Sequence, residues 1–170
     1  SLPLFFYLRQ FVKSNQGKKI PIPMFNLLEG GRHASASLNF QEFLVIPASS
    51  KPYSESLRIA AETFQSLKKI LFEKSESILS ADEGGFSPNL TTNQAGITIL
   101  REAIEHANFS YAYDVFIGLD TAANSFLDGK VYKINDRSVA YDSQDLAEFY
   151  KMLVTEHSLI YLEDPFAEND

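Results

Sequence analysis

The chain has 170 residues, of which 45% are hydrophobic and 22% charged, values typical of a globular protein with a core of its own. Its formal net charge of -7 argues against broad contact with a phosphate backbone, so nucleic acid is not an expected partner. The absence of cysteine excludes disulfides and thiolate metal sites and favours an intracellular location. No apolar run approaches the roughly 20 residues that cross a bilayer, so we expect no membrane span.

The N-terminal stretch 2–8 is hydrophobic but short. It has no basic region before it and no small-residue cleavage site after it, so it does not resemble a signal peptide. We predict a core-facing helix that ends within 15–19. Its apolar face comprises Leu4, Leu8, Phe11 and Val12.

Two short strands are predicted next. Pro21 and Pro23 disfavour helix at the residues before them and impose an extended path. The first strand covers 24–28, and the second covers 40–47 with Gln41 and Glu42 near its start. A polar loop of small residues separates them.

Two amphipathic helices are predicted from apolar residues at helical spacing. The first runs from Ser54 to about Lys74, and its apolar stripe comprises Leu57, Ala60, Ala61, Phe64, Leu67 and Leu71. The second follows a capping box formed by Thr91 and Gln94. Its stripe comprises Ile97, Leu100, Ile104 and Ala107.

Between these helices, Asp82 and Glu83 stand directly before Gly84 and Gly85. Glycines allow a sharp turn and the close approach of a ligand, and carboxylates beside such a turn can bind metal or transfer protons. A surface turn with two solvated acids is the alternative interpretation. Asp82 fits a turn residue better than a catalyst, because neighbours in an extended segment point in opposite directions.

The second half of the chain predicts a βαβ unit. A strand over 115–119 ends at Asp120, a helix over 143–156 is capped by Ser143, and a strand over 159–162 ends at Glu163. Before that helix, Asp128-Gly129 predicts a hairpin turn. The class is therefore α/β.

Because the two strands of a βαβ unit are parallel, Asp120 and Glu163 leave the sheet at the same end, where α/β folds place their chemistry. Two such carboxylates can bind one hard cation such as Mg²⁺. Two acids that merely end their strands and face water are the alternative.

Taken together, these segments resemble the enolase (phosphopyruvate hydratase) family. The stretches that carry the resemblance are PIPMFNLLEGG (21–31), HASASLNFQEFLVIP (33–47), ADEGGFSPN (81–89), IGLDTA (117–122) and LEDPF (162–166). They occur in the family's order and cover nearly the whole chain from Pro21.

The resemblance implies a partial (β/α)8 barrel of the TIM type, consisting of the first four strands and opening with two consecutive strands. Residues 1–19 would be a helix from the end of an N-terminal domain, and residues 20–170 the first half of the C-terminal barrel domain. The implied activity is that of a Mg²⁺-dependent lyase of glycolysis and gluconeogenesis, which interconverts 2-phosphoglycerate with phosphoenolpyruvate and water. The implied protein is cytoplasmic and homodimeric at full length.

The resemblance also implies roles for individual residues. Asp120 and Glu163 match metal ligands, and Glu163 also borders the substrate. Glu83 matches the general acid that protonates the leaving hydroxyl, with Glu42 as its carboxylate partner. A carboxyl group crowded by another carboxylate has a raised pKa, which suits a proton donor. Substrate-binding positions are matched by His33, Gln41 and Glu42, although His33 could instead cap a backbone group in its loop.

The sequence departs from the family pattern at several loop positions. These are Glu29, Arg32, Ser35, Ala81 and Ser125, where enolases usually have Asn, Ser, Gly, Gly and Glu. None of them removes a residue matched to a catalytic role. The family's base lysine and third metal-binding aspartate have no match within these residues, so we expect the 170-residue chain alone to be inactive. Another lyase or racemase of the superfamily, or a non-catalytic module, is the alternative function.

Overall fold

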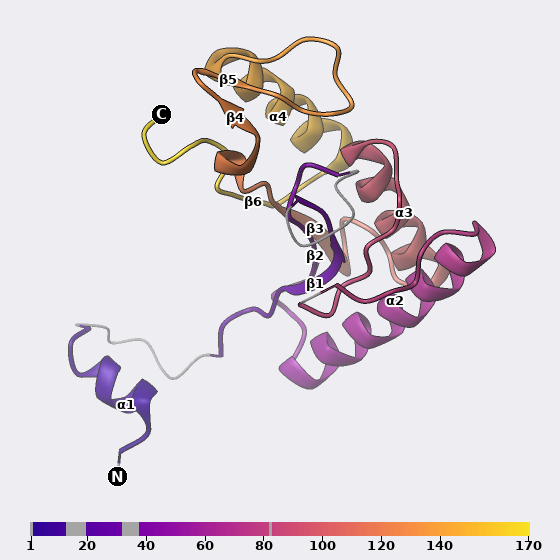
Figure 1. Ribbon diagram of the computed structural model, residues 1–170. Coiled ribbons are helices and arrows are strands. Elements are labelled where there is room, and N and C mark those ends of the chain that lie inside the picture. The colour runs from indigo at the N-terminus through magenta and orange to yellow at the C-terminus, as the bar shows by residue number, and fades with distance from the viewer. Residues whose placement is uncertain (1, 13–19, 32–37, 82) are drawn as a thin grey trace.

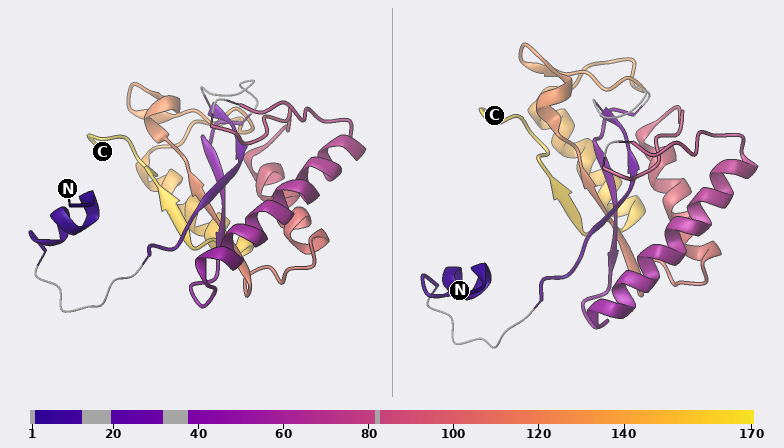
Figure 2. Two further views of the ribbon diagram at one scale, coloured as in Figure 1. Left: turned by 90° about the horizontal axis from the view of Figure 1, so that it is seen from below. Right: turned by 60° about the horizontal axis from the view of Figure 1, so that its bottom comes forward.

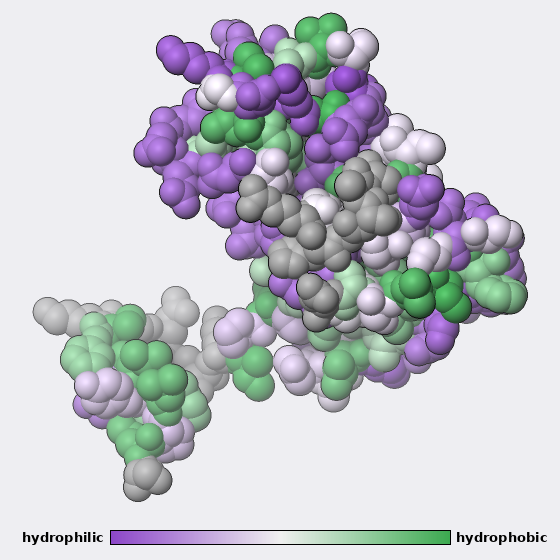
Figure 3. All heavy atoms as spheres, viewed as in Figure 1, coloured by the Kyte–Doolittle hydropathy of each residue, from purple (hydrophilic) through white to green (hydrophobic). Residues whose placement is uncertain are grey.

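The computed structural model describes residues 2–12, 20–31, 38–81 and 83–170. Its first element, helix α1 (Leu4–Arg9), has no buried residue. Leu4 is 70% exposed and Phe11 is 71% exposed, so the prediction of a core-facing helix is wrong for this chain. Figure 1 shows α1 apart from the sheet, and Figure 3 shows its hydrophobic surface. The predicted end of this helix at 15–19 lies outside the described residues.

The centre of the fold is a four-stranded sheet in the order β1-β2-β3-β6. Its strands are β1 (Phe25–Glu29), β2 (Glu42–Pro47), β3 (Val115–Asp120) and β6 (Tyr161–Glu163). The β1–β2 and β2–β3 pairs are antiparallel, whereas β3 and β6 are parallel, which confirms the predicted βαβ unit. The sheet does not close on itself, so the architecture is mixed α/β with an open sheet (Figure 2).

Three long helices pack with the sheet in the core: α2 (Tyr53–Glu73), α3 (Asn93–His106) and α4 (Ser143–His157). Their buried side chains form one cluster with Phe43, Val45, Ile117 and Leu119 of the two central strands. A side chain at Gly96 would lie 2.7 Å from the Phe43 ring, so glycine allows α3 to approach β2 closely.

The buried face of α2 is rotated relative to the predicted stripe. Leu57 and Ala61 are exposed, whereas Ser56, Thr63 and Ser66 are buried. The Ser66 hydroxyl lies 3.0 Å from His106 Nδ1 of α3, a polar contact that the positions of the apolar residues do not reveal. Leu57 instead borders a groove beside β1.

Two predicted helix caps are displaced by one residue. The Thr92 hydroxyl, and not that of Thr91, accepts a hydrogen bond from Ala95 N at 3.0 Å at the start of α3. At the start of α4, Asp142 accepts from Asp145 N at 2.8 Å, so Asp142 is the cap rather than Ser143.

The connection from β3 to α4 covers residues 121–142. It contains a 3-10 helix, η2 (Ala123–Phe126), and the predicted hairpin of β4 (Leu127–Asp128) and β5 (Val131–Tyr132). Gly129 has φ +65°, the conformation that favours glycine in such a turn.

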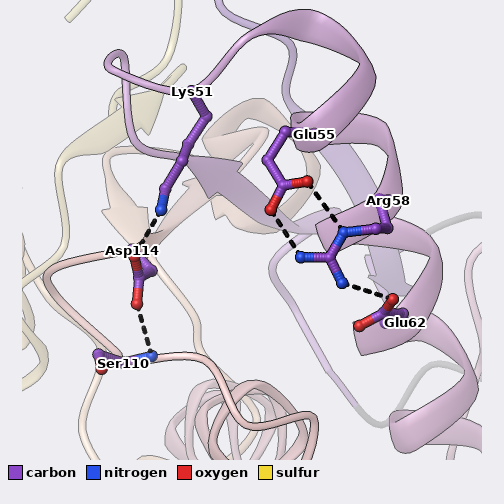
Figure 4. Close-up of polar contacts among 6 residues, drawn as sticks. All are labelled: Lys51, Glu55, Arg58, Glu62, Ser110 and Asp114. Carbon is purple, nitrogen blue, oxygen red and sulfur yellow. Dashed lines mark hydrogen bonds and ion pairs between the residues drawn. The ribbon is translucent and has the colours of Figure 1, made fainter.

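Polar contacts fasten the connections where β2 ends and β3 begins (Figure 4). The Lys51 ammonium lies 2.7 Å from the Asp114 carboxylate, which also accepts from Ser110 N at 3.2 Å. On α2, the Arg58 guanidinium forms ion pairs with Glu55 and Glu62 at 2.6 and 2.7 Å.

No helix in the described part of the chain is long and apolar enough to cross a membrane.

Candidate active site

The register of the sheet aligns acidic residues from all four strands. Glu42 pairs with Glu29 on one side and with Asp120 on the other, and Asp120 pairs with Glu163. Directly opposed residues of neighbouring strands have closely spaced Cβ atoms and share a face of the sheet. The expected meeting of Asp120 and Glu163 at one end of the sheet is therefore observed, and Glu42 joins them.

Strand alternation explains the face on which these acids lie. Phe43 and Leu119 are opposed and belong to the core beneath the helices, so their neighbours Glu42 and Asp120 point to the other face. Side chains on that face are closely packed around Gly118, because a Cβ atom at Gly118 would lie 2.8 Å from Ile46 and from Tyr161.

Glu42 and Glu83 form a carboxyl pair. The Glu83 carboxyl is near enough to Glu42 to oppose the ionisation of Glu42. Partial burial, the hydrogen bond with Glu83 and the negative charges of Glu83, Asp120 and Glu163 raise the pKa of Glu42 to about 8. The pair therefore carries a proton at neutral pH, held by the residue that the resemblance names as the partner of the proton donor.

Asp120 occupies a partly buried position at the end of β3. Burial raises the pKa of its carboxyl, as do the charges of Glu163, Asp164 and Glu83, while a hydrogen bond from Ala122 N at 3.0 Å opposes that rise. Ala122 itself has the left-handed backbone conformation, with φ +45°, directly before η2. Glu163 is exposed and accepts a hydrogen bond from the Tyr161 hydroxyl at 3.1 Å.

The charge of this cluster fits a divalent cation. Within the described residues, no ion pair with lysine, arginine or histidine involves Glu42, Glu83, Asp120 or Glu163. Carboxylate oxygens are the ligands that Mg²⁺ prefers, and a cation here would offset the mutual repulsion that raises the pKa of Asp120. The described residues nevertheless contain no group of three acidic or histidine side chains arranged as a metal site.

The remaining predicted site residues have different outcomes. Gln41 is half-buried directly before β2, and its backbone N donates to Asp120 O at 2.9 Å. His33, Asp82 and the departures at Arg32 and Ser35 lie outside the described residues. The structure adds two residues beside Glu83 to which the sequence assigned no role, Glu29 and Asn26. The only sequence signal for either was the unusual residue type at position 29.

Comparisons with known proteins place these residues in a family context. The family model for the enolase C-terminal TIM barrel domain matches residues 17–170. The enolase of Anaplasma phagocytophilum (strain HZ) is 40% identical over 169 residues, covering 99% of this chain and 38% of its own length. The enolase of Ehrlichia ruminantium (strain Welgevonden) is 38% identical over 170 residues, covering all of this chain and 39% of its own length. The chain thus spans about two fifths of the length of these curated relatives.

Proposed function

The chain belongs to the enolase family, and we propose that it forms the first half of the barrel of a Mg²⁺-dependent phosphopyruvate hydratase. Residues 20–170 would supply the barrel's first four strands, opening with β1 and β2 in succession, and residues 1–19 would end a preceding domain. The observation that carries the proposal is the alignment of Glu42, Asp120 and Glu163 across neighbouring strands, with Glu83 near Glu42.

The proposed chemistry is the loss of water from 2-phosphoglycerate. Glu42 holds a proton at neutral pH, and the exposed Glu83 presents it to the leaving hydroxyl. As the carbon–oxygen bond breaks, the hydroxide leaves as water and the electron pair of the enolate forms the carbon–carbon double bond of phosphoenolpyruvate. Gln41 and His33 are proposed to contact the substrate.

Asp120 and Glu163 are the residues that would hold Mg²⁺. When bound, the cation stabilises the negative charge that builds up on the substrate carboxylate and makes the α-proton acidic. Family membership alone supports two further parts of the proposal, a homodimeric whole protein and a cytoplasmic location.

A chimaera tests the proposal. Residues 1–170 replace the matching stretch of the Anaplasma enolase, and the formation of phosphoenolpyruvate is followed with and without chelator. We expect chelator-sensitive turnover in the chimaera and none in the 170-residue chain, because the family's base lysine has no match in this chain. A folded chimaera without turnover, or one that acts only on another acid substrate, would overturn the proposal in favour of a module or another superfamily enzyme.

A further inference from the structure

The segment that carries Glu83 lies along the edge of β1. Phe86 N donates to Leu27 O and Glu29 N donates to Phe86 O, both at 2.9 Å. The Phe86 ring is buried and stacks on Phe64 with 4.4 Å between centroids. Phe86 therefore anchors the segment three residues after Glu83.

Glu83 itself lies in a tight backbone turn that ends at Gly84. Gly84 has φ +95°, and its N–H donates to Ala81 O at 3.1 Å. The Glu83 side chain itself is exposed, and its contact with the Asn26 amide is long, at 3.5 Å. A long exposed side chain retains much rotamer freedom, so its placement depends strongly on its backbone.

Glu29 holds this turn from β1. Its side chain is buried, with the whole residue 1% exposed, and its Oε1 accepts a hydrogen bond from Gly85 N at 2.7 Å. Its Oε2 lies 3.5 Å from Glu83 N. A side chain at Gly85 would come within 2.9 Å of Oε1, so the carboxylate fits closely against the turn.

We propose that Glu29 is a positioning residue for Glu83. A buried carboxylate needs hydrogen-bond donors, and the backbone of the turn supplies them. By fixing Gly85 and the Glu83 amide against β1, Glu29 holds the backbone of Glu83 on the strand that pairs with Glu42, the residue opposite Glu29 in the sheet. Its burial excludes direct contact with substrate. The catalytic meaning of this placement rests on the proposed function.

Amide hydrogen exchange in the 170-residue chain tests the contact without any assumption about activity. In Glu29→Ala, exchange at Gly85 should rise at least about tenfold, because a hydrogen bond to a charged acceptor is lost. Glu29→Gln retains the acceptor oxygen and should stay within about threefold of the wild type. Protection of the Ile117 and Leu119 amides from exchange reports whether each variant is folded. If Glu29→Ala is not folded, Glu29→Asp replaces it, and the same rise in exchange at Gly85 is expected because the shorter side chain does not reach the turn.

Glu76 offers a matched control, because its carboxylate accepts from Asn89 N at 2.9 Å at the other end of the same segment. Glu76→Ala should leave Gly85 protected. Unchanged exchange at Gly85 in the folded Glu29→Ala or Glu29→Asp variant, or an equal rise in Glu76→Ala, would overturn the proposal.

Kinetics of the chimaera test the consequence for catalysis. Glu29→Ala should lower kcat at least about tenfold with KM within about threefold, and Glu29→Gln should restore most of kcat. Equal kcat in Glu29→Ala and the unmodified chimaera would overturn the positioning role. If the unmodified chimaera has no turnover, the proposed function fails, while the exchange data still decide whether Glu29 holds the turn.

Discussion

At the scale of single residues, Glu42 gives the chain an unusual dependence of stability on pH. Its pKa is about 8 in the folded state against 4.5 for the unperturbed group. Between these values the folded chain keeps a proton that the unfolded chain releases, so the free energy of unfolding falls as pH rises. Burial and the neighbouring charges raise the pKa of Asp120 too, and that effect has the same sign.

Glu42→Gln should therefore stabilise the metal-free chain at pH 8 but not at pH 4. Because Glu42 is only partly buried, solvent screening limits the gain to about 1–2 kcal/mol at pH 8. Thermal melts of both proteins across this pH range provide the measurement. A difference in Tm that does not change with pH would show that Glu42 ionises normally.

The positions of Asp120 and Glu163 could be predicted from the sequence, because a helix between two apolar strands requires the strands to be parallel. The contact between Glu29 and Gly85 could not be predicted. It joins residues 56 positions apart through a backbone amide, and no local pattern encodes such a contact.

At the scale of elements, the strands and long helices follow from apolar periodicity, but their ends and faces do not. Thr91 and Thr92 are both suitable caps by residue type, and only the path of the preceding backbone selects between them. The same limit applies at Asp142 and Ser143. On α2 the buried face includes the small polar residues Ser56, Thr63 and Ser66, which apolar spacing alone does not select.

The cap of α3 can be tested with a pair of neighbouring substitutions. Thr92→Ala removes the acceptor for Ala95 N and should cost about 1 kcal/mol of stability. Thr91→Ala should change stability by less than about 0.5 kcal/mol. Urea denaturation of the two variants measures both values. A larger loss of stability in Thr91→Ala than in Thr92→Ala would show that Thr91, and not Thr92, caps α3.

At the scale of the whole molecule, apolar grooves lie at the two edges of the open sheet. One, of about 470 Å³, lies between β1 and α2 and is lined by Phe25, Leu57 and Phe64 among others. The second, of about 310 Å³, lies between α4 and β6 and includes Val154 and Phe166. Exposed apolar grooves beside sheet edges favour association.

We therefore expect the 170-residue chain to self-associate with rising concentration. Leu57→Lys combined with Val154→Lys places a charge in each groove and should shift the population toward monomer. Val139→Lys is the control, because Val139 is 70% exposed and lines neither groove. Light scattering over a concentration series is the measurement, and a monodisperse wild-type monomer with a cooperative melt would contradict the expectation.

The central claim is that Glu83 supplies a proton while Asp120 holds the cation, and amide substitutions in the chimaera separate these roles. Isotope exchange of the substrate's α-proton is measured beside turnover. In Glu83→Gln, turnover should collapse while exchange and Mg²⁺ binding persist, because removal of the α-proton precedes departure of the hydroxyl. In Asp120→Asn, both exchange and turnover should be lost and should partly recover at high Mg²⁺. Loss of metal binding in Glu83→Gln, or full exchange at low Mg²⁺ in Asp120→Asn, would contradict the assignment.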